Sequence, residues 1–410
     1  MDNPIQYYSW GSRRLIPDLL GEENLEEKPY AELWMGAHPR GTSWVNQGEE
    51  ERRKLSDLIV EAPKEYLGAA ATGRFDSRLP FLFKVLAAER ALSIQAHPNL
   101  RQAEEGYWRE EERGLAVDAF ERNYRDQNHK PELICALTPF TALCGFRPVE
   151  DIRGFYCRLE SRVFEQDLSL ENEEQGNWLR EFFHKLMSLD ESKTHRLLTD
   201  LLRWAEREKN VLPEAALVLK LRDQHGMDLG IQAPLFLNLV HLEPGEALYQ
   251  AAGVLHAYVE GMGVELMANS DNVLRGGLTE KHIDADELLK ILSFEPAPAD
   301  IIRGRALEGG FEYYPVPIDE FQLLRGGIEK GETLHRRGRY SLDIALCSDG
   351  QLRLRGAEGA GGGELHLQRG ESCLIPHAFG EYEVDGGGEL FIATIPPGRQ
   401  EAGSVQGKKI

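Results

Sequence analysis

The stretch ALSIQAHPNL at residues 91–100 places an amide and an imidazole two residues apart. The run reads as a buried β-strand, in which residues i and i+2 share a face, so Gln95 and His97 would project together while Ile94 and Ala96 pack the other way. An amide oxygen and a neutral imidazole can both bind a divalent metal. Two ligands do not make a site, and these residues alone favour an interior hydrogen-bonded pair.

Two further side chains could complete a metal site. Glu132 follows Pro131 in NHKPEL, where a carboxylate at the start of an apolar run is oddly placed unless it is paired or metal-bound. The alternative for Glu132 is a solvated strand-end glutamate, and for His256 in GVLHAY it is an isolated core histidine. With Gln95 and His97, these residues supply one amide, two imidazoles and one carboxylate, a set suited to zinc with room for water or a substrate oxygen.

The glycines before His256 resemble those of a cupin jelly roll. In the second metal-bearing hairpin of that fold, a glycine precedes five residues and a proline, and a second glycine precedes a histidine by three positions. Gly245, Gly253 and His256 keep these intervals, with Ala251 in place of the proline. The match favours a metal-ligand role over an isolated core histidine.

Charge and composition exclude several classes of partner. The formal charge of −21 repels nucleic acid and anionic membranes, so we expect neither as a partner. No apolar run approaches the roughly 18–20 residues of a membrane span, and the N-terminus lacks the parts of a signal peptide, so we expect a cytoplasmic protein. The five cysteines are scattered and form no CxxC pair, which favours reduced, mostly buried thiols.

The elements that must position these side chains are mainly β. Short apolar runs punctuated by Gly, Pro and Asn predict strands over residues 1–100, 130–148, 233–267 and 342–396. Apolar residues at helical spacing predict an α-helical insert, and a further helix over residues 284–294. Residues 101–127 are highly charged and predict a surface helix or loop.

A repeated pattern links the two β regions. His241-Leu242 and Gly245-Glu246 reappear at the same spacing in residues 366–371, which favours a duplicated jelly roll whose second copy has Glu381 opposite His256. We therefore predict a mainly β fold with an α insert. Its parts are a catalytic cupin domain over residues 1–148 and 229–297, the helical insert over 149–228, and a C-terminal jelly-roll domain without metal over 298–410.

Taken in order, the motifs resemble one family, the type I mannose-6-phosphate isomerases, also called phosphomannose isomerases. The resemblance runs through YAELWMGAHP, LPFLFKVL, SIQAHPN, NHKPEL, GVLHAY and GVELMANSDNVLRGGLT. It implies an aldose–ketose isomerase with one Zn2+ per chain that interconverts D-mannose 6-phosphate and D-fructose 6-phosphate through a cis-enediol(ate). It also implies a phosphorylated hexose as the partner, and a monomer.

The resemblance assigns roles to individual residues. The family's metal ligands fall on Gln95, His97, Glu132 and His256, its active-site arginine falls on Arg275, and its second cation falls on Lys281. Its architecture is a central catalytic cupin, an inserted helical domain and a C-terminal jelly roll. We expect Arg275 to stabilise the enediolate through charge-assisted hydrogen bonds.

Three residues of the matching motifs are candidates for proton transfer. Lys130 lies beside a metal ligand, where a dication and partial burial would favour its basic form, although it could equally be a spectator that hydrogen-bonds substrate hydroxyls. Glu265 could act on the proton or pair with a lysine. Asp271 could instead be a turn residue that orients Arg275, which is the favoured interpretation.

Phosphate is expected on Lys281, with Arg275 or Ser93 nearby, and Lys84 and His38 could line the same pocket. Two other functions compete with isomerisation. A different metal-dependent cupin enzyme, such as an oxygenase, would prefer iron and more histidines. A sugar-binding cupin without activity would not need Arg275 and Lys281.

Overall fold

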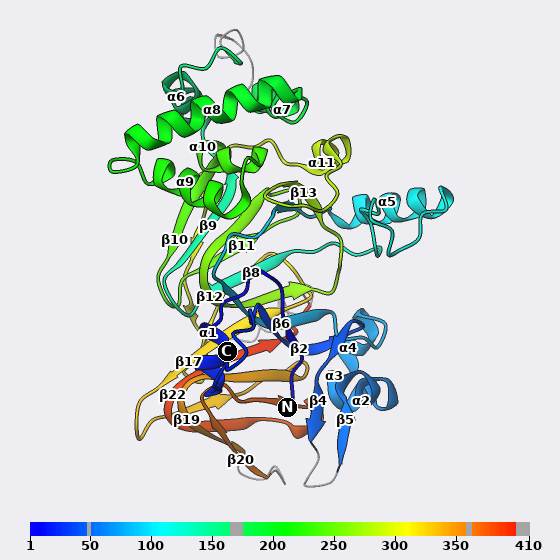
Figure 1. Ribbon diagram of the computed structural model, residues 1–410. Helices are drawn as coiled ribbons and strands as arrows, with labels where there is room; N and C mark the ends of the chain where they lie inside the picture. Colours follow the sequence, from blue (N-terminus) through cyan, green and yellow to red (C-terminus); the bar gives the residue numbers. More distant parts are fainter. Residues whose placement is uncertain (47–50, 165–174, 358–362, 399–410) are drawn as a thin grey trace, which may run out of the picture.

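The computed structural model describes residues 1–46, 51–164, 175–357 and 363–398. Within these residues a larger and a smaller antiparallel β-sheet form the framework, and the helices between residues 149 and 236 gather at the end remote from the smaller sheet (Figure 1). None of the described helices combines the length and the apolar character needed to cross a membrane. The predicted mainly β fold with helical segments is confirmed.

The larger sheet follows the order β1-β2-β6-β12-β8-β11-β14, and β3, β7, β9, β10 and β13 join it off this path. Its strands are β1 (Ile5–Gln6), β2 (Glu32–His38), β3 (Gly41–Thr42), β6 (Phe81–Ala88), β7 (Ile94–Ala96), β8 (Glu132–Ala136), β9 (Phe140–Phe146), β10 (Leu237–Leu242), β11 (Ala247–Gln250), β12 (His256–Ala268), β13 (Leu274–Gly277) and β14 (Ile301–Ile302). A separate ribbon pairs β4 (Trp44–Asn46) with β5 (Arg52–Lys54).

The long strand β12 holds the two halves of this sheet together. Its first residues pair with β7 and β9, and the residues from Gly261 onward pair with β6 and β8. A register shift between Tyr258 and Glu260 and the φ of 120° at Gly261 mark the change of partners. A Cβ on Gly261 would lie 2.7 Å from the carbonyl oxygen of Pro139, so the change of partner strands at this position requires glycine.

The two faces of β6 have different neighbours. Phe81, Phe83 and Val85 belong to a hydrophobic core shared with strands of the smaller sheet, including residues Leu323 and Phe391. The intervening residues of β6 face the other way, because side chains alternate along a strand. One face of the larger sheet therefore packs on the C-terminal strands, which leaves the opposite face for the site.

Helices account for most of the stretch between β9 and β10. They are α6 (Val149–Arg158), α7 (Gln175–Met187), α8 (Glu191–Glu208) and α9 (Pro213–His225), followed by η2 (Leu229–Gln232) and α10 (Ala233–Phe236). Residues 165–174, within the predicted insert, lie outside the described residues. The predicted helical segment is confirmed, whereas the domain limits stay a prediction.

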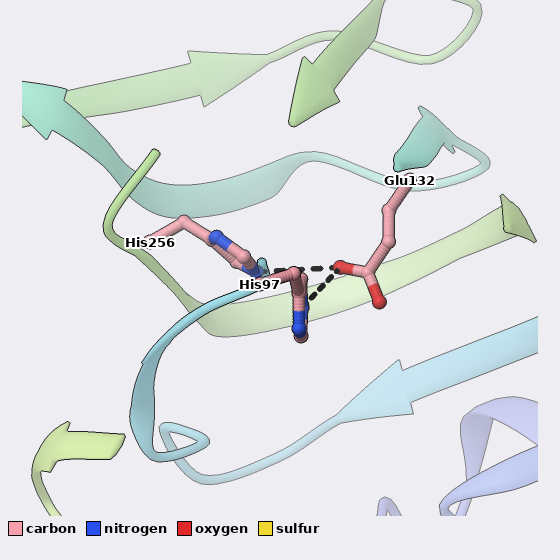
Figure 2. A group of neighbouring side chains, drawn as sticks. All are labelled: His97, Glu132 and His256. Carbon is pink, nitrogen blue, oxygen red and sulfur yellow. Dashed lines mark ion pairs between the residues drawn. The ribbon is translucent and has the colours of Figure 1, made fainter. Parts of the chain in front are cut away.

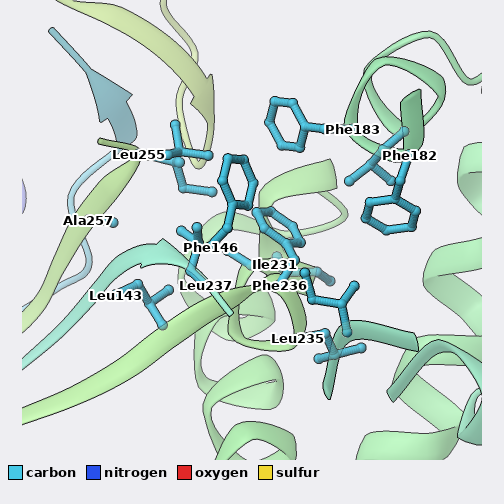
Figure 3. Packing of buried hydrophobic residues seen from close by; sticks show 14 of the residues in the cluster. Leu143, Phe146, Phe182, Phe183, Ile231, Leu235, Phe236, Leu237, Leu255 and Ala257 are labelled. Carbon is cyan, nitrogen blue, oxygen red and sulfur yellow. The ribbon is translucent and has the colours of Figure 1, made fainter. Parts of the chain in front are cut away.

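The helical segment packs directly behind the strands that carry the site (Figure 3). Phe146 at the end of β9 stacks on Phe294 with ring centroids 5.6 Å apart and contacts Phe183 of α7 at 5.4 Å. Leu255 and Ala257, which flank His256, belong to the same core. Burial of this aromatic cluster therefore fixes the start of β12.

Other helices lie outside this segment. They are α1 (Leu15–Leu20), α2 (Leu55–Glu61), α3 (Pro63–Leu67), α4 (Ala69–Arg74), α5 (Leu100–Glu112) and α11 (Ala285–Ile291). The helices α5 and α11 confirm the expectations for the charged segment and for residues 284–294. The helices α1 to α4 contradict the expectation that residues 1–100 contain only strands and turns.

The smaller sheet follows the order β15-β16-β17-β22-β19-β20, with β18 joined to β22 and β21 joined to β19. Its strands are β15 (Arg305–Ala306), β16 (Glu312–Tyr313), β17 (Gln322–Ile328), β18 (Thr333–Arg336), β19 (Asp343–Gly356), β20 (Glu364–Gln368), β21 (Ser372–Ile375) and β22 (Tyr382–Thr394), with η3 (His377–Phe379) before β22. Gly245 and Gly370, the paired glycines of the repeat, have φ values of 88° and 86° and each precedes a strand. This agreement supports the predicted duplication.

All five cysteines are free, and four of them are buried, as the sequence predicts: Cys135, Cys144, Cys347 and Cys373. Cys157 is exposed.

Candidate active site

Three strands bring His97, Glu132 and His256 together in the buried interior (Figure 2). His97 follows β7, Glu132 begins β8 and His256 begins β12. Oε2 of Glu132 lies 3.4 Å from Nε2 of His97 and 3.3 Å from Nε2 of His256. These atoms lie within 4.8 Å of one another, so the trio could hold one metal ion.

Both imidazoles are oriented for metal binding by their other nitrogen. Nδ1–H of His97 donates to the carbonyl oxygen of Asn272 at 2.8 Å, and Nδ1–H of His256 donates to that of Val254 at 2.9 Å. Each ring therefore directs an Nε2 lone pair at Glu132. Both Nε2 atoms and Oε2 of Glu132 are buried without a hydrogen-bond partner, which is costly unless a cation lies between them.

The electrostatics of the trio also fit a metal ion. Burial lowers the pKa of His97 to about 4, despite the nearby Glu132, so the ring is neutral at pH 7. Burial alone would raise the pKa of Glu132, but Lys130 and the two imidazoles hold it well below its usual range. A neutral His97 and an ionised Glu132 are ready ligands without loss of a proton.

Gln95 reaches the site by strand register. It is the antiparallel partner of His256 in β12 and of Arg275 in β13, and residues opposite each other in this way share a face. However, β7 ends at Ala96, so the expectation that His97 belongs to the same strand is wrong by one residue. The backbone carbonyl of His97 instead accepts a hydrogen bond from the N–H of Gly253 at 2.8 Å. Gln95 as a metal ligand stays a prediction.

A cavity of about 950 Å³ opens beside the trio. All the predicted site residues except His97 and His256 line this cavity: Ser93, Gln95, Lys130, Glu132, Glu265, Asp271, Arg275 and Lys281. Lys84 and His38, which the sequence also placed in the pocket, line it too. Glu132 is therefore the member of the trio that belongs to both the metal centre and the cavity wall. Residues from motifs that lie far apart in the chain, between Ser93 and Lys281, thus line one cavity.

Cations gather on one side of the cavity. Burial and the charges of Arg275, Arg125 and Arg40 lower the pKa of Lys281, and burial and Arg125 lower the pKa of Arg275. In the part of the chain that the structure describes, no carboxylate pairs with Arg125, Arg275 or Lys281. A cluster of unpaired cations on a chain of charge −21 points to an anionic ligand.

A buried network crosses the sheet next to these residues. Nζ of Lys84 donates to Oε2 of Glu265 at 2.8 Å and lies 3.5 Å from Oε1 of Glu32. The Tyr258 hydroxyl donates to Oε1 of Glu265 at 2.8 Å, and Nε1 of Trp34 donates to Glu32 at 2.7 Å. Burial raises the pKa of Glu265 despite the opposing charge of Lys84. Both oxygens of Glu265 are thus already engaged.

The other two proton-transfer candidates have different partners. Nζ of Lys130 lies 3.0 Å from Oε1 of Glu132. The Asp271 carboxylate accepts a hydrogen bond from Arg40 at 2.5 Å and lies 3.8 Å from Nε2 of His38. Among the described residues its charged partners are therefore Arg40 and His38, and the expectation that Asp271 orients Arg275 finds no support.

The sequence did not point to Arg40, Arg125 or Asn272 as parts of the site. A detectable signal existed only for Asn272, which belongs to the Asn-Ser-Asp-Asn turn. Nε2 of His129, just before β8, lies 2.7 Å from a carboxylate oxygen of Glu320, near the start of β17. It therefore joins the site strand to the C-terminal part of the chain.

Residues 1–149 match the family model described as phosphomannose isomerase type I, catalytic domain. The mannose-6-phosphate isomerase of Salmonella typhimurium is 38% identical over 95% of this chain and 97% of its own length. The chain belongs to the type I phosphomannose isomerase family. Its similarity to the Mus musculus mannose-6-phosphate isomerase is 34% identity over 95% of this chain and 92% of that protein.

Solved structures of phosphomannose isomerases share the whole fold. The Salmonella typhimurium mannose 6-phosphate isomerase bound to fructose 6-phosphate and zinc matches with a TM-score of 0.89 and 36% identity, covering 97% of this chain and 98% of that one. A mannose 6-phosphate isomerase bound with zinc and yttrium matches with a TM-score of 0.88, also at 36% identity. This chain therefore shares its fold, as well as its motifs, with solved phosphomannose isomerases.

Proposed function

We propose that this protein is a zinc-dependent mannose-6-phosphate isomerase, which interconverts D-mannose 6-phosphate and D-fructose 6-phosphate. The convergence of buried, unpartnered Nε2 atoms of His97 and His256 on Oε2 of Glu132 carries the proposal, because it supplies a zinc site at the wall of a cation-lined cavity. The proposal is supported by relatives named mannose-6-phosphate isomerase that match nearly the whole chain, and by a similar solved structure that binds fructose 6-phosphate and zinc.

His97, Glu132 and His256 would hold the zinc ion, with Gln95 as the proposed fourth protein ligand. When bound, zinc supplies Lewis-acid polarisation of the substrate's carbonyl and hydroxyl oxygens. The buried hydrogen bonds of both Nδ1 atoms keep the imidazoles in the tautomer that this role requires. The chain's own task is to place the open sugar and to move a proton between C1 and C2.

Arg275 and Lys281 divide the anionic charge of the substrate. Arg275 is the register partner of Gln95, so its guanidinium is placed to stabilise the enediolate oxygens beside the metal centre. Lys281 lies in the exposed loop after β13 and is placed to bind the phosphate. Ser93 lines the same cavity and could donate to either group.

Lys130 and Asp271 remain the candidates for the proton transfer. Both line the cavity, whereas both oxygens of Glu265 accept hydrogen bonds from Lys84 and Tyr258. We therefore assign Glu265 a supporting role that holds Lys84 in place. A Lys130→Ala variant that keeps zinc but loses turnover would favour Lys130, and the same pattern in Asp271→Asn would favour Asp271.

A coupled assay for fructose 6-phosphate formed from mannose 6-phosphate, before and after chelator treatment, tests the function. We expect activity that chelation removes and zinc restores. Iron at one ion per chain with oxygen consumption would favour a different cupin enzyme, and sugar binding without turnover at any metal would favour a binding protein. The monomeric state and the cytoplasmic location stay predictions.

A further inference from the structure

The amide of Asn272 joins the metal centre to the loop that carries Arg125. Asn272 is fully buried, and its backbone carbonyl accepts the Nδ1–H bond of His97 at 2.8 Å. Its side-chain oxygen accepts backbone N–H bonds from Arg125 at 2.7 Å and from Asp126 at 3.2 Å. Its amide nitrogen donates to the carbonyl oxygens of Asp126 at 2.8 Å and Asn128 at 2.9 Å.

These contacts use both halves of the amide and allow one orientation. The oxygen faces two N–H donors and the nitrogen faces two carbonyl acceptors, so a rotation of the amide by 180° would oppose like groups on both sides. An aliphatic side chain at position 272 would leave the partly buried N–H of Arg125 without its acceptor. The backbone at Arg125 is therefore fixed by Asn272.

A carboxylate strengthens the same link from the opposite side. Asp126 accepts hydrogen bonds from the Ser270 hydroxyl at 2.8 Å and from the backbone N–H of Asp271 at 2.6 Å. The loop before β8 and the loop before β13 are thus tied together at two adjacent points. Any shift of one loop moves the other, and with it the carbonyl that holds His97.

Arg125 extends from this fixed point into the cavity. It lines the cavity with Arg275 and Lys281, and its charge disfavours the protonated forms of both. No carboxylate among the described residues pairs with Arg125. Three like charges placed together without a counter-ion repel one another, and an anion bound between them removes that repulsion.

We propose that Arg125 is a third phosphate-binding cation of the cavity and that Asn272 is a positioning residue, which sets the place of Arg125 relative to the metal ligand His97. The inference deepens the proposed function, on which it rests for the identity of the substrate. The ligand chemistry is a phosphate monoester dianion. Arg125 contacts the phosphate, whereas Asn272 acts only through Arg125 and His97.

A double-mutant cycle on the zinc-loaded, full-length protein tests the proposal. Binding of inorganic phosphate is measured by calorimetry for the wild type, Arg125→Ala, Asn272→Ala and the double variant. We expect each single variant to weaken phosphate binding about tenfold or more, and the double variant to bind phosphate no more weakly than Arg125→Ala. Losses that multiply would overturn the positioning role, and unchanged affinity in Arg125→Ala would overturn the phosphate role.

Zinc affinity separates positioning from general damage. By chelator competition, Asn272→Ala is expected to lose about tenfold or more in zinc affinity, because loss of its side-chain bonds to the neighbouring loop lets the backbone carbonyl that orients His97 shift, whereas Arg125→Ala keeps the wild-type value. Arg13→Ala and Asn24→Ala are matched controls outside the cavity wall, removing one cation and one loop-bridging amide. Both are expected to bind phosphate and zinc like the wild type.

Two further points keep the test decisive. If Asn272→Ala does not fold, Arg125→Ala and Arg125→Lys alter an exposed side chain, and unchanged phosphate affinity in both would still reject the proposal. Phosphate and zinc binding are measured without turnover, so the inference and the isomerase function can fail separately. Weakened phosphate binding in a protein without isomerase activity would uphold Arg125 and reject the function.

Discussion

Gln95 lies directly across from His256 in the adjacent antiparallel strands β7 and β12. On its other side Gln95 is the register partner of Arg275 in β13. One row of side chains therefore runs from the proposed metal ligand His256, through the proposed amide ligand Gln95, to the proposed enediolate-stabilising Arg275. Because strand register sets this order, the metal and the arginine keep their relative positions without a direct bond between them.

Replacement of Gln95 by alanine tests the fourth ligand. We expect Gln95→Ala to fold and to lose at least about tenfold in zinc affinity. Removal of a group that only hydrogen-bonds to a metal ligand already lowers metal affinity by about that factor, and removal of the ligand itself should lower it at least as much. Competition with a chelator measures the affinity. Ser93→Ala, which removes a polar group from the same segment, should keep wild-type zinc affinity. Equal zinc binding by Gln95→Ala and the wild type would leave the trio as the complete set of protein ligands.

Removal of zinc should also lower thermal stability. Without the cation, Oε2 of Glu132 and two Nε2 atoms are buried and unpaired, and a ligand present at 100 times its dissociation constant stabilises a folded protein by about 2.7 kcal/mol. We expect zinc to raise the melting temperature of chelated protein by a few degrees, and to do so much less in His256→Ala. A zinc effect of equal size in that variant would place the metal elsewhere.

Arg275 and Lys281 should separate kinetically. Arg275→Ala is expected to lower kcat by orders of magnitude with zinc retained, because the lost contact forms mainly in the transition state. Lys281→Ala is expected chiefly to raise KM for mannose 6-phosphate. Steady-state kinetics with metal analysis measure both. Turnover like the wild type in Arg275→Ala, or an unchanged KM in Lys281→Ala, would refute that residue's assignment.

Gly261 should not tolerate a side chain. Its φ of 120° and the 2.7 Å approach of the Pro139 carbonyl to an added Cβ make Gly261→Ala strained, by about 1–3 kcal/mol of unfolding free energy. Gly327→Ala in β17 is the matched control, since nothing lies within 4 Å of its added Cβ. Urea unfolding of the two variants should show a loss only at Gly261. Equal stability would mean that β12 can cross between its partners without glycine.

The sequence predicted what depends on local pattern. The helices of the insert follow from their spacing of apolar residues, and the trio of His97, Glu132 and His256 follows from motifs that each carry a polar group at the edge of an apolar run. The family resemblance then placed Arg275 and Lys281, which no spacing rule could have joined to a strand about 180 residues earlier. Geometry confirms that these residues converge.

Contacts between residues far apart in the sequence could not be predicted from local sequence patterns. Arg125 lies in a charged segment whose arginines look alike in sequence, and only the hydrogen bond from its backbone N–H to the side-chain oxygen of Asn272 distinguishes it. The pairing of Lys84 with Glu265 depends on the register of β6 against β12, which no local motif specifies. The short helices α2 to α4 were missed because each is stabilised by packing in the core of the larger sheet more than by its own periodicity.

The buried Asp343 makes the C-terminal sheet sensitive to acid. Its carboxylate accepts hydrogen bonds from Arg336 at 3.1 Å, Arg339 at 3.0 Å and Tyr382 at 2.9 Å, and it has no exposed surface. Burial alone would raise its pKa, but the two arginines hold the pKa below its usual value. The ionised form is therefore favoured by folding.

The stability that Asp343 contributes should be lost at low pH. Because the folded pKa of Asp343 is below that of the unfolded chain, about 3.9, its contribution is complete above that value and is lost as the pH falls through the folded pKa. Asp343→Asn breaks a buried ion pair, so we expect a loss of about 3–5 kcal/mol at pH 7. The gap to the wild type should stay constant down to about pH 5 and narrow below pH 4.

Urea unfolding at fixed pH values measures that gap. Asp385→Asn is the control, because its carboxylate also pairs with an arginine, Arg353, but near the surface, where water screens the interaction. We expect a much smaller loss for it at pH 7. If the difference between Asp343→Asn and the wild type stays the same from pH 7 to pH 3, the pKa of Asp343 is the same in the folded and the unfolded chain, and the two arginines do not lower it.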